Sequence, residues 1–65
     1  MFNFLKKSNV ARVKIIHTEY RVYFHQYTYT VQAENGRLYH KTYNYRIFPP
    51  GEIDVIIDLK YWSKL

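Results

Sequence analysis

The alternation of apolar and polar residues is clearest on both sides of Asn35-Gly36. From Tyr27 to Ala33, just before this pair, the apolar and aromatic residues all occupy odd positions, with polar residues between them: Tyr27, Tyr29, Val31 and Ala33. A period of two is typical of a strand with one buried face. After the pair, Tyr39, Tyr43 and Tyr45 again share one parity. Because Asn-Gly is the strongest short-range hairpin signal, this segment is predicted to be a β-hairpin.

Two turn geometries would join the strands of this hairpin in different registers. A two-residue type I′ turn pairs Val31 with His40. A three-residue loop, with Gly36 in the left-handed conformation, pairs Val31 with Tyr39 and puts the aromatic residues of both strands on one face. In this second register Tyr29 pairs with Lys41 and Tyr27 with Tyr43. Hydrophobic patterning decides register where one face is buried, so we favour the three-residue loop.

The remaining strands are predicted from the same periodicity. Val10 to His17 alternates and is rich in β-branched residues, which strands prefer. A second strand is expected from about Val22 to Ala33, with a β-bulge near His25-Gln26, where the parity of its apolar positions changes. Pro49-Pro50-Gly51 marks a turn. The last strand is expected from Ile53 to Tyr61, with Trp62 capping an open end of the core.

These elements predict an all-β fold, a small antiparallel meander of four or five strands, with an SH3-like or OB-like barrel as its curled form. The chain has 65 residues, which is enough for one domain. We assign residues 1–9 to an N-terminal arm and residues 10–65 to a single β domain. Eight Tyr, four Phe and one Trp supply large side chains for a small core. No cysteine is present, which is consistent with a cytoplasmic location.

The charge distribution points to an anionic partner. The formal net charge is +5. Up to Arg46 there are eight Lys and Arg against Glu19 and Glu34, whereas the segment from Ile47 onward is mildly acidic. A basic domain favours nucleic acid or an acidic protein as its partner. The alternative is that the charge serves solubility alone.

Several short motifs occur in an order known from one family. They are Ala-Arg-Val at Ala11–Val13, Tyr-Thr-Val at Tyr29–Val31, Asn-Gly-Arg-Leu-Tyr at Asn35–Tyr39, Pro-Pro-Gly at Pro49–Gly51, Ile-Asp-Leu-Lys at Ile57–Lys60 and Trp-Ser-Lys at Trp62–Lys64. The chain resembles an all-β domain family of unknown function that is common in bacterial membrane-associated proteins. It departs from that family at Leu59-Lys60, where the family has proline after aspartate. The resemblance implies a β fold, no catalytic residues and action near a membrane. The sequence itself predicts no membrane partner, because no apolar run approaches the roughly 20 residues of a membrane span.

The sequence predicts no enzymatic activity, no cofactor and no metal. Glu52, Asp54 and Asp58 are expected on one face of the last strand, as solvated charges that discourage aggregation. The histidines fall on separate elements without close metal-ligand spacing: His17, His25 and His40. The chain has no glycine-rich phosphate loop, and its two serines lie near its termini.

Tyrosines mixed with basic residues are the most suggestive feature for function. Rings that stack on bases, beside cations that meet phosphates, are typical of single-stranded nucleic-acid platforms. We therefore expect single-stranded nucleic-acid binding of low sequence specificity. The predicted site residues are Arg37, Tyr39, Lys41, Tyr43, Tyr45 and Arg46, together with Arg12 and Lys14. In the register that we favour, these tyrosines pair with Tyr27 and Tyr29 and belong to the core, whereas the type I′ register would turn them outward as a stacking surface.

The alternative function is a protein-protein interaction module or inhibitor of the phage or mobile-element type. It would use the tyrosine-rich surface or an open sheet edge, since Tyr, Trp and Arg are enriched at interface hot spots. No small-molecule substrate is expected. A homodimer is a further way for so short a chain to enlarge its core.

Overall fold

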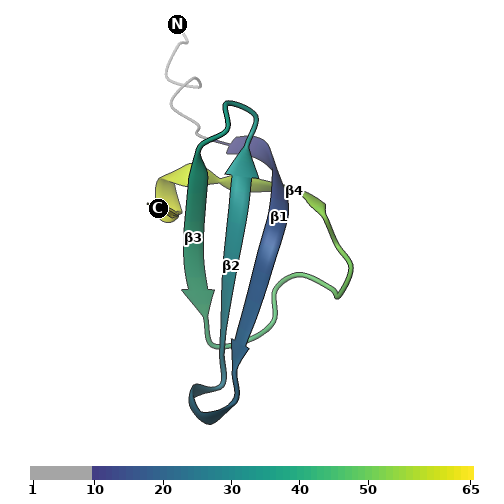
Figure 1. Ribbon diagram of the computed structural model, residues 1–65, viewed down its shortest axis with the longest axis vertical. Helices are drawn as coiled ribbons and strands as arrows, with labels where there is room; N and C mark the ends of the chain where they lie inside the picture. The colour runs from purple at the N-terminus through teal and green to yellow at the C-terminus, as the bar shows by residue number, and fades with distance from the viewer. Residues whose placement is uncertain (1–9) are drawn as a thin grey trace, which may run out of the picture.

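A computed structural model describes residues 10–65 as a single antiparallel β-sheet (Figure 1). The predicted N-terminal arm, residues 1–9, lies outside the described residues. The strands are β1 (Val10–Arg21), β2 (Gln26–Ala33), β3 (Leu38–Tyr43), β4 (Asp54–Asp58) and β5 (Ser63–Lys64), with short 3₁₀ turns η2 (Val22–Phe24) and η3 (Leu59–Tyr61). Their order across the sheet is β4-β1-β2-β3-β5. The all-β prediction is confirmed.

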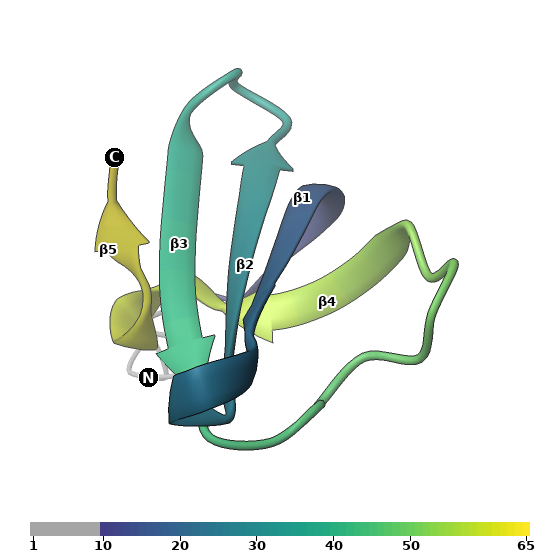
Figure 2. The ribbon, with the colours of Figure 1, turned by 60° about the horizontal axis from the view of Figure 1, so that its bottom comes forward.

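The sheet is curled because its two edge strands are almost consecutive in the chain. β4 and β5 lie at opposite edges, yet only η3 and Trp62 separate them. Figure 2 shows β4 running steeply across the direction of β2 and β3, after which the chain turns up to β5. Among residues 10–65 the two edges do not pair with each other, so the sheet is a curled meander and not a closed barrel.

The core fills the concave side of this curl. Among residues 10–65, six residues are buried in it, from β1, β2, β3, β4 and the segment after η3: Val13, Tyr29, Val31, Tyr39, Ile57 and Trp62. Half of them are aromatic, because so few residues can enclose a core only if each side chain covers a large area.

The central hairpin has the register that we favoured. Val31 pairs with Tyr39 and Tyr27 with Tyr43. The Gly36 N–H donates to the Ala33 carbonyl at 2.9 Å, and the Ala33 N–H donates to the Arg37 carbonyl at 2.9 Å. Gly36 has φ 88°, which a residue without Cβ adopts at little cost. The three-residue loop is therefore confirmed.

The predictions for the first turn and the bulge were wrong. β1 continues to Arg21 instead of ending at His17, and β2 begins only at Gln26. The turn between them closes with His25 in the left-handed conformation, φ 53°, its N–H donating to the Val22 carbonyl at 3.3 Å. This turn accounts for the change of parity near His25.

The bulge lies in β1, where the register shifts between Ile15 and His17. The extra residue, Ile16, moves the inward-facing positions from odd to even numbers. Tyr20 therefore pairs with Tyr27 and stacks on its ring with the centroids 4.6 Å apart. The bulge thus brings the far half of β1 into register with the tyrosines of β2.

The last strand is shorter than predicted. β4 spans Asp54–Asp58, and the Asp58 carboxylate accepts the Lys60 N–H at 3.0 Å, which starts η3. Because η3 breaks the alternation, Tyr61 is exposed although a continuous strand would have turned it inward. Trp62 is buried, in agreement with its predicted capping role.

Candidate binding groove

The three predicted stacking tyrosines differ in exposure. Tyr39 is 8% exposed and belongs to the core, whereas Tyr45 is 64% exposed. Tyr43 is half-buried between them, with its ring centroid 6.3 Å from that of Trp62. Burial, together with the nearby Tyr45 and Tyr29 hydroxyls, raises the pKa of Tyr43 above its ordinary value. The core interpretation therefore holds for Tyr39 and in part for Tyr43, and only Tyr45 is freely accessible.

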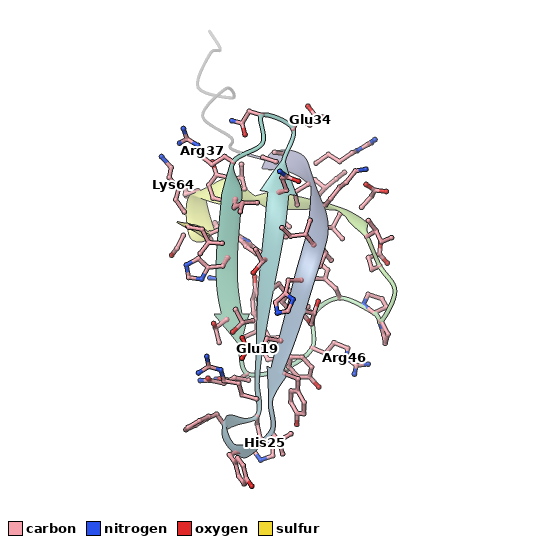
Figure 3. The ribbon with its side chains drawn as sticks, viewed as in Figure 1. Glu19, His25, Glu34, Arg37, Arg46 and Lys64 are labelled. Atoms are coloured by element: carbon pink, nitrogen blue, oxygen red, sulfur yellow. The ribbon has the colours of Figure 1, made fainter. Side chains whose placement is uncertain are left out.

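The predicted cations on the hairpin are divided between two places. The Lys41 ammonium lies 5.4 Å from the Tyr43 ring centroid and donates a hydrogen bond to the Tyr61 carbonyl at 3.1 Å. Arg37 lies at the loop end of the hairpin, where Figure 3 places it near Lys64. Lys41 is thus held against the aromatic side of the sheet, and Arg37 extends from its end.

Arg12 and Lys14 lie on the opposite face of the sheet. They alternate with Val13, which is buried, so their side chains leave the convex side. Lys14 pairs with Asp54 of β4, and Arg12 pairs with Ile56, between Asp54 and Asp58. These carboxylates reduce the positive potential around both cations. The eight predicted site residues therefore do not form one continuous surface.

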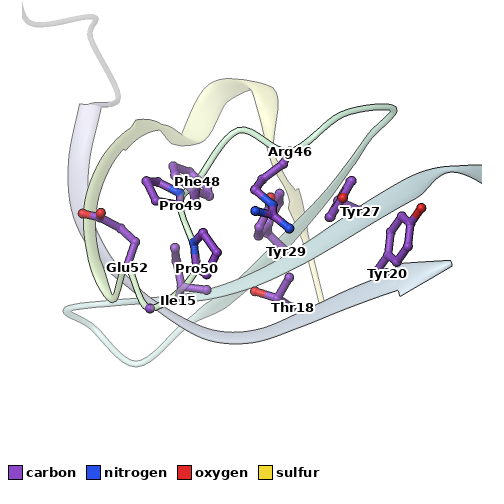
Figure 4. Close-up of a pocket in the computed structure, with 11 residues that line it drawn as sticks. Ile15, Thr18, Tyr20, Tyr27, Tyr29, Arg46, Phe48, Pro49, Pro50 and Glu52 are labelled. Carbon is purple, nitrogen blue, oxygen red and sulfur yellow. The ribbon is translucent and has the colours of Figure 1, made fainter. Parts of the chain in front are cut away.

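A groove on the concave side gathers several residues that sequence reasoning did not connect. It has a volume of about 370 Å³. It lies between the C-terminal half of β1, the N-terminal half of β2 and the loop that precedes β4. Tyr20, Tyr27 and Tyr29 line it from the strands, and Phe48, Pro49 and Pro50 line it from the loop (Figure 4). Sites for extended or small ligands are typically apolar clefts of this size with a few polar groups.

The loop is fixed to the sheet by Tyr29. Its ring meets Phe48 edge-on with the centroids 4.9 Å apart, and its hydroxyl oxygen accepts the Ile47 N–H at 3.3 Å. The Glu52 N–H donates to the Pro49 carbonyl at 3.2 Å, which closes the turn around Pro50 and Gly51. The groove therefore has two defined walls before any ligand binds.

Charged side chains lie at two positions along the groove. The Arg46 guanidinium lies 5.7 Å from the Tyr27 ring centroid and is exposed. Figure 4 shows Arg46 beside Tyr27 and Glu52 toward the other end. Glu52 belongs to this loop and not to β4, so the prediction that it shares a strand face with Asp54 and Asp58 was wrong. Arg46 is the one predicted site residue that lines the groove.

The histidines do not converge. His17 pairs with Thr30, and Thr30 pairs with His40, so the two histidines are separated by a whole strand on the convex face. His25 lies in the turn after η2. In the described part of the chain, no group of three or more His, Asp or Glu side chains is placed to hold a metal ion.

No family model, curated protein or solved structure matches the chain. The resemblance to a bacterial membrane-associated family therefore stays a prediction. Within residues 10–65, neither short helical turn approaches the length and apolar character that a membrane-spanning helix needs.

Proposed function

We propose that this domain is a non-enzymatic protein-interaction module that binds an extended, acidic segment of a partner in the aromatic groove. The observation that carries the proposal is the stacked pair Tyr20 and Tyr27 facing Pro49 and Pro50, with the exposed Arg46 guanidinium beside it.

The chemistry of the groove favours an extended peptide. Proline-rich segments dock in aromatic-lined grooves because their polyproline II conformation is already formed and loses little entropy on binding. Arg46 adds a planar donor that suits a carboxylate. The net charge of +5 attracts an acidic partner at long range.

The composition of the chain favours a cytoplasmic inhibitor as the setting for this binding. A chain without cysteine suits the reducing cytoplasm. A small basic binding domain suits an inhibitor of the phage or mobile-element type, which would act by occupying a surface of a host protein.

Arg46→Glu should lower the affinity for an acidic proline-rich peptide about tenfold, since a hydrogen bond to a charged group contributes about 1.5 kcal/mol. The probe is a synthetic peptide of alternating Glu-Pro and Pro-Pro units, titrated into the full chain and followed by amide chemical shifts. The shifts are expected at Tyr20, Tyr27 and the loop around Phe48.

The matched control is Arg37→Glu, which makes the same charge change at the far end of the hairpin and should alter the affinity little. A second pair of variants compares the peptide affinity of Tyr20→Ala, in the groove, with that of Tyr45→Ala, outside it. Only Tyr20→Ala should lower this affinity. Shifts that map to another surface, or equal losses in Arg46→Glu and Arg37→Glu, would reject the groove as the binding site.

Single-stranded nucleic acid is the second candidate ligand. It is favoured by the net charge of +5 and by cations that lie over tyrosine rings, among them Lys41 beside Tyr43 and Arg46 beside Tyr27. Base stacking contributes about 1–3 kcal/mol per base, and cations add phosphate contacts. Salt separates the two candidates, since phosphate contacts weaken steeply as counterions are added.

For the nucleic-acid candidate, the double variant Lys41→Glu with Arg46→Glu should abolish binding of a short single-stranded oligonucleotide without unfolding the domain. The measurement is an amide titration at low and moderate salt. In wild type, the shifts should centre on residues 37–46 and fade as salt is raised. Binding that survives both charge reversals, or that does not weaken with salt, would eliminate this candidate.

A further inference from the structure

The far half of β1 has an open edge. β4 pairs with β1 only over Val10–Lys14, and the last backbone bond between the two segments joins the Ile15 N–H to the Ile53 carbonyl at 2.8 Å. In the part of the chain that the structure describes, residues 17–21 pair with β2 alone. Figure 1 shows this half of β1 continuing past β4 toward the η2 turn. An unpaired strand edge is a template for another strand.

The charges along this edge complement a second copy of themselves. Glu19 and Arg21 lie on the same face of β1, where the Arg21 Nε donates to the Glu19 carboxylate at 3.3 Å. If two copies pair antiparallel with Tyr20 opposite Tyr20, Glu19 of each copy lies opposite Arg21 of the other. Opposite charges across a strand pair stabilise the pairing, and like charges oppose it. This register gives two favourable pairs and one tyrosine contact on the axis.

The same register also accounts for exposed apolar side chains. The three residues of η2 have no place in the core, and Tyr23 is 94% exposed. Continuing the pairing beyond Arg21 brings η2 of each copy toward Ile16 of the other, which is also exposed. Exposed apolar residues gathered near one edge are typical of an interaction surface.

We propose that two copies of this chain associate through the free edge of β1, with Tyr20 on the twofold axis and one sheet running through both copies. The inference goes beyond the proposed function and does not depend on it. Tyr20 also lines the groove, so the twofold axis would set the two grooves side by side.

Sedimentation of the full chain over a wide dilution series tests this proposal by charge reversal. Wild type should form a concentration-dependent dimer. Glu19→Arg alone and Arg21→Glu alone should each weaken the dimer at least tenfold, because each variant places two pairs of like charges opposite one another. The double variant Glu19→Arg with Arg21→Glu should restore wild-type association. Glu34→Arg, in the exposed hairpin loop, is the matched control and should leave the dimer unchanged.

Far-UV circular dichroism of each variant separates loss of association from loss of fold. Both side chains are about half exposed, so the single variants should stay folded. A wild type that stays monomeric throughout, single variants that associate like wild type, or a folded double variant that stays monomeric would each overturn the proposal. If another protein supplies the strand that pairs with this edge, the wild type would stay monomeric throughout the dilution series. The peptide titration of Arg46→Glu is a separate measurement, so failure of the groove proposal leaves this one standing.

Discussion

Tyr29→Ala is expected to destabilise the domain more than any change at an exposed tyrosine. Tyr29 is 2% exposed, its ring packs edge-on against Phe48, and its hydroxyl holds the backbone of Ile47. Truncating a buried aromatic residue to alanine costs about 3–5 kcal/mol. A domain of this length has about 3–10 kcal/mol of total stability. The free energy of unfolding, measured with urea and followed by Trp62 fluorescence, should fall by about 3–5 kcal/mol, a large share of that total.

Two variants separate the roles of the Tyr29 ring and hydroxyl. Tyr29→Phe keeps the ring and loses only the hydrogen bond to Ile47, at a cost of about 0.5–1.5 kcal/mol. Tyr45→Ala removes an exposed tyrosine and should change the stability by no more than about 0.5 kcal/mol. If Tyr29→Ala unfolded at the same urea concentration as Tyr45→Ala, Tyr29 would not be the centre of the core.

The central hairpin was predictable because the sequence specifies it locally. Asn35-Gly36 supplies the positive φ that the loop needs, and the Asn35 side chain also accepts the Arg37 N–H at 2.9 Å. The alternation of Tyr27, Tyr29 and Val31 then selects the one register that buries the tyrosines of both strands. The turn residues and the hydrophobic pattern favour the same register here, so the local sequence is sufficient to predict this hairpin.

The first hairpin was not predictable in the same way. Its turn, Val22 to His25, contains neither glycine nor proline and has three apolar residues that resemble strand residues. His25 adopts a positive φ that a non-glycine residue takes only when its surroundings impose it. The bulge at Ile16 leaves no signal in the sequence, because its benefit is the contact of Tyr20 with Tyr27 on a neighbouring strand.

The groove depended on these same non-local features. Tyr20 lies between the two predicted strands, Val10 to His17 and Val22 to Ala33, so the alternation does not place it beside Tyr27. The sequence predicts only a turn at Pro49-Pro50-Gly51, whereas the hydrogen bond from Ile47 to Tyr29 holds this loop against the sheet as a wall of the groove. The sequence predicts Arg12 and Lys14 as part of the basic site because it does not reveal that Asp54 lies beside them. That proximity follows from the pairing of β1 with β4, which no local pattern encodes.

Trp62→Ala is expected to have the second large effect, a loss of about 3–5 kcal/mol in the free energy of unfolding. Trp62 is 8% exposed, and its side chain belongs to the buried core. It packs against Tyr43 at the point where the chain passes from β4 to β5. Since only η3 and Trp62 link the two edges of the sheet, losing this ring removes the packing that keeps the sheet curled.

Tyr61→Ala is the matched control for Trp62→Ala, because it removes the neighbouring aromatic ring, which is 62% exposed. Urea unfolding followed by far-UV circular dichroism should show a change of no more than about 0.5 kcal/mol for Tyr61→Ala. Amide hydrogen exchange of Trp62→Ala should show faster exchange first at Leu65, whose N–H donates to the Leu38 carbonyl at 3.0 Å. The amides of the β2–β3 hairpin should exchange only through global unfolding, since the turn and the backbone hydrogen bonds of this hairpin do not depend on Trp62. Equal losses for Trp62→Ala and Tyr61→Ala would mean that the curl is maintained without the tryptophan, by the β1–β4 ladder and the Tyr29–Phe48 contact alone.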